Sequence, residues 1–153
     1  MSTKSEKKLE KILQLIERLT IESTKGTPII VEGRKDLNAL RKFGLTGDII
    51  PAKSAGKSFF DVVDEIQRRQ KRETILLLDF DGPGRVWTNR LTRRLEEVRI
   101  IPHVNIWKAL FNLVRYDVKD IEGLPTYLNT LRKTRNQAWK TRMHKPTKTK
   151  RTI

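Results

Sequence analysis

The chain of 153 residues contains no cysteine, and its apolar residues form only short runs. The absence of cysteine excludes disulfides, cysteine-ligated zinc, iron–sulfur clusters and cysteine nucleophiles. No run approaches the roughly 18 consecutive apolar residues of a transmembrane helix. The N-terminal stretch MSTKSEKKLEKIL also lacks the apolar segment of a secretory signal. We therefore expect a cytoplasmic protein with no membrane partner.

Acidic residues are scarce relative to basic ones. The 18 Asp and Glu residues against 33 Lys and Arg give a formal net charge of +15, which points to a polyanionic partner, in this case nucleic acid. Residues 132–153 hold nine Lys or Arg and no acid, so we predict a basic, flexible tail. Trp139 can stack on a base there. The other nucleic-acid-binding candidates in the tail are cations: Arg132, Lys133, Arg135, Lys140 and Arg142.

The rest of the chain alternates between helical and strand patterns. Leu9, Ile12 and Ile16 have the spacing of an amphipathic helix. Short apolar runs predict four strands, at residues 28–31, 48–52, 74–78 and 98–104, and the first of them is expected to be buried on both faces. Helical stretches separate these runs, as in right-handed βαβ units. We predict a Rossmann-like α/β fold with a parallel four-stranded sheet flanked by helices. The predicted parts are an N-terminal helix in residues 1–26, an α/β domain with a C-terminal helical extension in residues 27–131, and the tail in residues 132–153.

Three acids directly follow predicted strands: Glu32 follows PIIV, and Asp79 and Asp81 follow TILLL. In open α/β sheets, ligands bind at the carboxyl ends of strands, near the point where the winding reverses. If the first and third strands are neighbours, the three carboxylates meet there. Carboxylates about 4–5 Å apart repel by about 3–4 kcal/mol at an effective dielectric constant near 20, so a cluster needs a cation or a proton. Oxygen ligands favour Mg²⁺ or Mn²⁺. The competing interpretation is that Asp79 and Asp81 only cap the following helix.

Two motifs built on these acids resemble those of the Toprim domain. The segment EGRKD at residues 32–36 is followed by DFDGPG at residues 79–84. The Toprim pattern has Glu-Gly after the first strand, an Asp three residues beyond the Gly, and D-x-D-x-x-G after the third strand. Topoisomerases, bacterial primases, nucleases, recombination mediators and the ribonuclease that matures 5S ribosomal RNA share this domain. The chain is most similar to the small stand-alone archaeal Toprim proteins and to that maturase.

The resemblance implies a role for each motif residue. Glu32 is then a metal ligand or general acid/base, and Asp79 and Asp81 hold Mg²⁺, with two ions in the site and Mn²⁺ able to substitute. Asp36 is left open between a supporting role in the site and a purely helical one, because an acid in the first turn of a helix is stabilised anyway. Gly33 and Gly84 are assigned to a tight strand-to-helix turn and to close approach to a phosphate.

Several other groups are weaker candidates. The segment AKSAGKS resembles a P-loop, but Pro51 occupies the place of its first glycine, so nucleotide binding by that motif is rejected. Lys53 and Lys57 in this segment either neutralise a substrate phosphate or are simply solvated. LLLDFDG is also similar to the first motif of haloacid-dehalogenase phosphatases, although it follows the third strand here. The acids of YDVKDIEGL at residues 116–124 are either supporting ligands or solvated.

These features favour a Mg²⁺-dependent nuclease acting on RNA or DNA, with a role in RNA processing. The alternative is a non-catalytic nucleic-acid-binding module that functions in RNA processing or DNA repair. Strand passage and priming are not expected, because the chain is too short for a gate and has no separate domain with a nucleophilic tyrosine.

Overall fold

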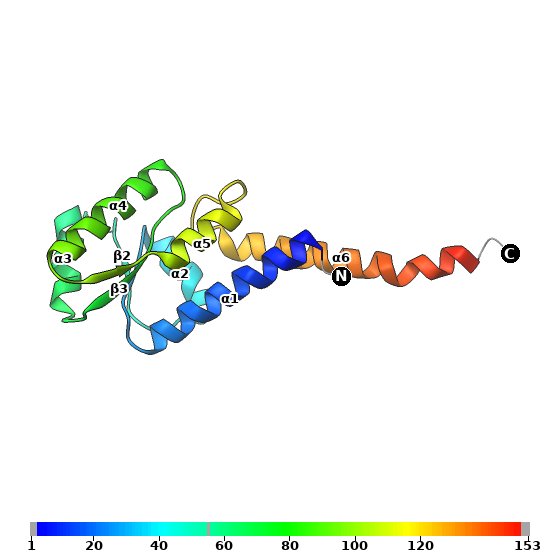
Figure 1. Ribbon diagram of the computed structural model, residues 1–153, viewed down its shortest axis with the longest axis horizontal. Helices are drawn as coiled ribbons and strands as arrows, with labels where there is room; N and C mark the ends of the chain where they lie inside the picture. The colour runs from blue at the N-terminus through cyan, green and yellow to red at the C-terminus, as the bar shows by residue number, and fades with distance from the viewer. Residues whose placement is uncertain (1–2, 55, 151–153) are drawn as a thin grey trace.

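The computed structural model describes residues 3–54 and 56–150, and the side chains of residues 3–54, 56–137 and 140. Four parallel strands form one sheet in the order β2-β1-β3-β4, with helices between them (Figure 1). This arrangement confirms the predicted Rossmann-like α/β fold. The elements in chain order are α1 (Lys4–Thr24), β1 (Ile29–Val31), α2 (Arg34–Lys42), β2 (Ile49–Pro51), α3 (Phe59–Arg68), β3 (Glu73–Leu77), α4 (Gly82–Glu97), β4 (Ile101–His103), α5 (Asn105–Val114) and α6 (Leu124–Lys150).

The sheet separates two hydrophobic cores. Because successive side chains of a strand point to opposite faces, Ile29 and Val31 belong to one core and Ile30 to the other. The first core contains residues of α1, α2, α5 and α6, and the second contains residues of α3 and α4. β1, β2 and all but the first residue of β3 are therefore buried on both faces. The edge strand β4 is not, since Ile101 is 55% exposed and Pro102 and His103 are only half-buried.

The helix α3 begins at a capping box formed by Ser58 and Asp61. The Ser58 Oγ accepts a hydrogen bond from the Asp61 amide at 3.3 Å, and the Asp61 carboxylate accepts one from the Ser58 amide at 2.8 Å. These two bonds satisfy backbone donors that the first turn of a helix leaves free. Behind the box, Val62, Val63 and Ile66 pack into the second core. The start of α3 is thus fixed by local chemistry and its inner face by tertiary packing.

The helix α6 packs on α1 over its first two turns and then extends away from the domain (Figure 1). Leu124, Leu128 and Leu131 are buried in the first core. We expected residues 132–153 to form a flexible tail, but α6 continues as a helix through Lys150. Packing nucleates the helix, and residues 132–145, which are rich in Lys and Arg and contain no Gly or Pro, then propagate it. Residues 151–153 lie outside the described part of the chain. Within that part, no helix is both long and apolar enough to cross a membrane.

Candidate functional site

The candidate site lies where strands β1 and β3 end side by side. The two strands pair in parallel, with Val31 opposite Leu77. Glu32 follows β1 directly, and Asp79 comes two residues after the end of β3. Since the order is β2-β1-β3-β4, the winding of the sheet reverses between these two strands. The first and third strands are therefore neighbours, which is the condition on which the strand-end acids were expected to meet.

Glu32 is a buried carboxylate whose oxygens lack hydrogen-bond donors. The residue is only 7% exposed, and neither Oε1 nor Oε2 accepts a hydrogen bond from the described residues. Lys53 Nζ lies 3.1 Å from Oε1, close enough for an ion pair but without hydrogen-bond geometry. The backbone fixes this lysine, because its amide donates to the Glu32 carbonyl at 2.9 Å. Buried oxygens without donors are costly, so this carboxylate is suited to binding a further cationic group.

Asp79 is the most perturbed acid of the site. Burial, followed by the negative charges of Glu32, Asp36, Asp120 and Asp81, raises its pKa from 3.8 to about 8. Its Oδ1 is buried and has no hydrogen-bond partner among the described residues. Without a cation, this carboxyl group therefore carries a proton at neutral pH. A divalent ion would replace that proton, since a nearby positive charge favours the ionised form.

Asp36 links the first turn of α2 to a loop near the end of the chain. Its Oδ2 accepts a hydrogen bond from the Gly33 amide at 3.0 Å, and its Oδ1 accepts one from the Glu122 amide at 2.8 Å. Burial raises the pKa of this carboxyl, although the two amide donors act to lower it, and Asp120 and Glu122 raise it further. The structure thus gives Asp36 both of the roles that were left open: it stabilises a helix start and it lies among the acids.

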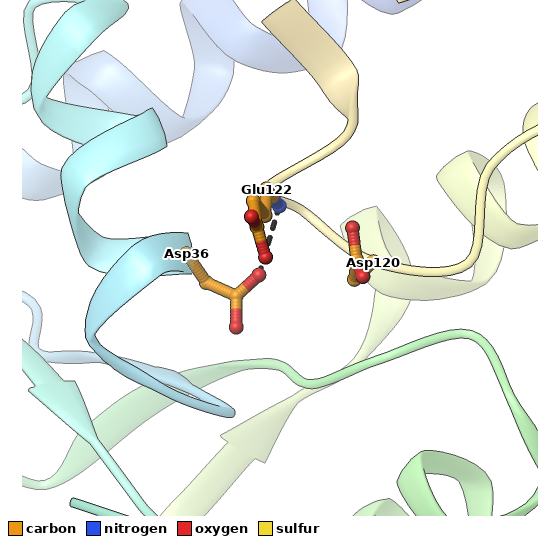
Figure 2. Close-up of side chains that lie close together, drawn as sticks. All are labelled: Asp36, Asp120 and Glu122. Carbon is orange, nitrogen blue, oxygen red and sulfur yellow. Dashed lines mark hydrogen bonds between the residues drawn. The ribbon is translucent and has the colours of Figure 1, made fainter.

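A second group of acids completes the cluster. Asp36, Asp120 and Glu122 each offer a carboxylate oxygen, and these oxygens lie within 4.8 Å of one another (Figure 2). The loop that carries Asp120 and Glu122 is held against the sheet, because the Phe80 amide donates to the Lys119 carbonyl at 2.7 Å. Asp117, in the same loop, pairs instead with Lys8 at 3.5 Å. We call Glu32, Asp36, Asp79, Asp81, Asp120 and Glu122 the acidic cluster.

Asp81 is the N-cap residue of α4. Its Oδ1 caps α4 by accepting a hydrogen bond from the Gly84 amide at 2.8 Å, so the competing capping interpretation describes its geometry. Within the described residues, the expected trio of Glu32, Asp79 and Asp81 is not gathered as closely as Asp36, Asp120 and Glu122 are. The cap takes up one oxygen of Asp81, but its charge still contributes to the raised pKa of Asp79.

The two glycines of the motifs differ in their structural demands. A Cβ at Gly84 would lie 2.2 Å from the Asp79 carbonyl oxygen, so α4 can approach the end of β3 only through a glycine. The close approach is therefore to the chain itself, and the expected approach to a phosphate does not explain it. Gly33 has a φ of −143°, and a Cβ there would lie 3.9 Å from Asp36 Oδ2. The expectation that its turn requires a glycine is wrong, because the backbone is extended and has room for a side chain.

The basic candidates fall into two groups. Lys53 belongs to the site, whereas Lys57 Nζ pairs with Glu65 at 2.7 Å and donates to the Pro51 carbonyl at 3.3 Å. Lys57 thus stabilises the loop before α3. The remaining candidates all lie on α6, in the half that extends from the domain (Figure 1): Arg132, Lys133, Arg135, Trp139, Lys140 and Arg142. The side chains of Trp139 and Arg142 lie outside the described residues.

The chemistry of the cluster fits a divalent cation. Its members offer only carboxylate oxygens, which are ligands for Mg²⁺ and Mn²⁺. Three of these oxygens, on Glu32 and Asp79, are buried and have no hydrogen-bond donor among the described residues. A cation would satisfy them and offset the mutual repulsion of the acids. Sequence reasoning identified Glu32 and Asp79 from their strand ends, but it had no signal that placed Asp120 and Glu122 beside them.

Two surface pockets lie away from the cluster. One, of about 500 Å³, is beside the beginnings of β1 and β3 and is lined by Arg18, Lys71 and Arg72 among others. The other, of about 600 Å³, is beside β4. Among the described residues, neither is lined by a member of the acidic cluster. We place the site at the cluster because buried oxygens of Glu32 and Asp79 have no hydrogen-bond partner among the described residues. A polymeric substrate can lie across an open edge without entering a pocket.

Comparison with known proteins identifies relatives of the whole domain. No family model matches the chain. A UPF0292 protein of Methanocaldococcus jannaschii is 36% identical over 121 residues, which cover 78% of this chain and 91% of the relative. A UPF0292 protein of Methanosarcina barkeri is 31% identical over 126 residues, covering 82% and 86%. A solved structure of an Aquifex aeolicus protein superposes with a TM-score of 0.61 at 27% identity, covering 72% of this chain and 94% of that one. The chain therefore belongs to the UPF0292 family.

Proposed function

We propose that this protein is a Mg²⁺-dependent hydrolase of nucleic-acid phosphodiesters. The observation that carries the proposal is the set of donor-free, buried oxygens of Glu32 and Asp79 within a cluster of six acids. Its position at the reversal of the sheet winding, where α/β proteins bind ligands, supports it. The resemblance of the motifs at residues 32–36 and 79–84 to the Toprim domain also supports it.

The residues at the site would have three different roles: binding the cation, accepting a proton and balancing the charge of the phosphate. Asp79, with Asp36, Asp120 and Glu122, would hold the cation, which supplies positive charge at the phosphoryl oxygen. Glu32 would accept the proton of the attacking water, since it is the buried carboxylate with no hydrogen-bond donor. Lys53, 3.1 Å from Glu32, would balance the charge of a phosphate that approaches the edge.

The basic surface supports a nucleic acid as the substrate. The chain has a net charge of +15, although six of its 18 acids belong to the acidic cluster. The half of α6 that leaves the domain carries Arg132, Lys133, Arg135 and Lys140 with no acid between them. These cations can bind phosphates at a distance from the cluster. The same observation favours the second candidate, a binding module in which the cluster holds a cation without catalysis.

Cleavage assays distinguish the two candidates. Labelled single-stranded and duplex RNA and DNA are incubated with the wild-type protein in Mg²⁺ and in EDTA. We expect cleavage in Mg²⁺ only, and a loss of about 100-fold or more in Glu32→Gln and Asp79→Asn. Asp64→Asn, which changes an exposed acid of α3 outside the cluster, is the matched control and should cleave at the wild-type rate.

The outcome that contradicts hydrolysis is equally definite. If no substrate is cleaved while Mg²⁺ still raises the melting temperature of the wild type, the site binds a cation without turnover, and the second candidate holds. Cleavage that persists unchanged in both Glu32→Gln and Asp79→Asn would indicate a contaminating nuclease.

A further inference from the structure

Three aromatic rings form a row across the start of α3 and the first half of α4. Phe59 and Phe60 lie in the first turn of α3, and Trp87 lies in α4. The ring centroids of Phe59 and Phe60 are 5.7 Å apart, and those of Phe59 and Trp87 are also 5.7 Å apart, each pair in an edge-to-face arrangement. We call Phe60, Phe59 and Trp87 the aromatic row.

The outer ring of the row lies outside both hydrophobic cores. Phe60 is 63% exposed, whereas the residues of α3 that pack into the core are Val62, Val63 and Ile66. The start of the helix is already stabilised by the capping box described above, so it does not depend on the ring of Phe60. An exposed phenylalanine beside two other rings is therefore a surface with unused stacking capacity.

The inner end of the row is joined to the acidic cluster by one lysine. Lys53 Nζ lies 5.2 Å from the centroid of the Trp87 ring and 3.1 Å from Glu32 Oε1. Farther out, the guanidinium of Arg90 lies 4.5 Å from the centroid of Phe59. Two cations thus flank a continuous row of rings that leads from the cluster to the exposed Phe60, and this pattern suits a ligand that is both aromatic and anionic.

We propose that the aromatic row binds unpaired bases of a single nucleic-acid strand whose backbone continues to the acidic cluster. Bases stack on aromatic side chains, and nearby cations neutralise the phosphates between them. In a duplex the base faces are covered by neighbouring base pairs everywhere except at the two ends, so a duplex offers the row far fewer stacking partners than a single strand does. The interleaved Lys53 and Arg90 argue against an apolar protein partner, because covering them would bury charge. The proposal that the backbone continues to the acidic cluster rests on the proposed hydrolytic function of that cluster, whereas the stacking of bases on the row does not.

Binding measurements without turnover test the row. Fluorescence anisotropy in EDTA at fixed salt is used with labelled oligouridine, oligothymidine and a blunt duplex, each about ten nucleotides long to span one site. Phe60→Ala should weaken binding of both single strands about 5- to 100-fold, the equivalent of one lost stacking contact. Binding of the duplex should change less than about twofold. Phe60→Tyr keeps the ring and should bind as the wild type does.

A matched control separates stacking from a general loss of aromatic surface. Tyr116 is 85% exposed and lies outside the row, so Tyr116→Ala should leave binding of all three probes unchanged. Phe60 is exposed, so Phe60→Ala should have the urea midpoint of the wild type. Equal losses for uridine and thymidine strands indicate recognition through the base, whereas a loss for RNA alone would point to the 2′-hydroxyl instead.

The failures of the two proposals can be distinguished. If Phe60→Ala loses single-strand binding but no variant or condition gives cleavage, the row stands and hydrolysis fails. If cleavage depends on Mg²⁺ and Phe60→Ala binds single strands as the wild type does, the row is overturned. Equal weakening of single strands and duplex, or a wild type that binds no single strand, also overturns it.

Discussion

Replacing the central acid of the cluster should change how stability depends on pH. In the metal-free protein, Asp79 has a pKa of about 8 in the folded state, against 3.8 for an ordinary aspartate. Between these two values the folded state holds a proton that the unfolded state has released. The free energy of unfolding of the wild type therefore falls as the pH rises from about 4 to about 8. Asp79→Asn has no such proton, so this contribution disappears in the variant.

The magnitude follows from the pKa of Asp79. The span from 3.8 to about 8 corresponds to about 6 kcal/mol at about 1.4 kcal/mol per pH unit. The carboxyl group is only partly buried, so solvent screening reduces this value, and we expect about 2–3 kcal/mol. Near pH 4 the wild type and Asp79→Asn should be similarly stable, because the protonated carboxyl and the amide are nearly isosteric. At pH 8 the variant should be more stable by that amount.

Urea unfolding in EDTA at several pH values between 4 and 9 measures the effect. Asp64→Asn serves as the control and should follow the wild-type curve. Adding Mg²⁺ at pH 8 should stabilise the wild type and much less so Asp79→Asn, since a ligand that binds only the folded state stabilises it by mass action. Parallel curves for the wild type and Asp79→Asn across this pH range would refute the reasoning.

Two further predictions concern the backbone of the site and the basic helix. Gly84→Ala places a Cβ against the Asp79 carbonyl and should lower the free energy of unfolding by about 1–3 kcal/mol. The control Gly82→Ala has no atom within 4 Å of its Cβ and should change the free energy of unfolding by less than about 0.5 kcal/mol. Equal urea midpoints for the two variants would contradict this prediction. Removing residues 132–153 deletes nine cations. If about half of them contact phosphates of duplex DNA, the slope of the logarithm of the binding constant against the logarithm of the salt concentration should become flatter by about 3–4. An unchanged slope in a salt titration would show that this part of α6 does not bind the nucleic acid.

Much of the fold and part of the site follow from local patterns in the sequence. The runs PIIV and TILLL are short and apolar, and each is followed by an acid, so they indicate buried strands that end at a polar edge. An acid that directly follows such a strand must lie at the carboxyl edge of the sheet, and this placed Glu32 and Asp79. The capping box of Ser58 and Asp61 is also local, since both of its bonds span three residues.

Other features depend on contacts between distant segments. The segment that was expected to be a flexible tail continues α6 as a helix. The leucines packed in the first core nucleate this helix, and each residue added to a nucleated helix costs little further free energy. Asp81 carried the same sequence signal as Asp79, yet the cap that it makes with Gly84 took up one of its oxygens. A strand-end acid followed by a helix can serve either purpose, and the sequence alone does not choose between them.

The sequence by itself determined the strands, the edge where the ligand site lies and the acids that end β1 and β3. Only the tertiary structure brought Asp120 and Glu122 to Asp36, which lies 84 residues before the first of them, through the hydrogen bond from the Glu122 amide to Asp36. Likewise, only the fold placed Lys53 between Glu32 and Trp87. The physical reason is that a strand or a cap is specified by neighbours within a few residues. A cluster of like charges forms only where packing elsewhere in the protein holds distant loops together against their repulsion.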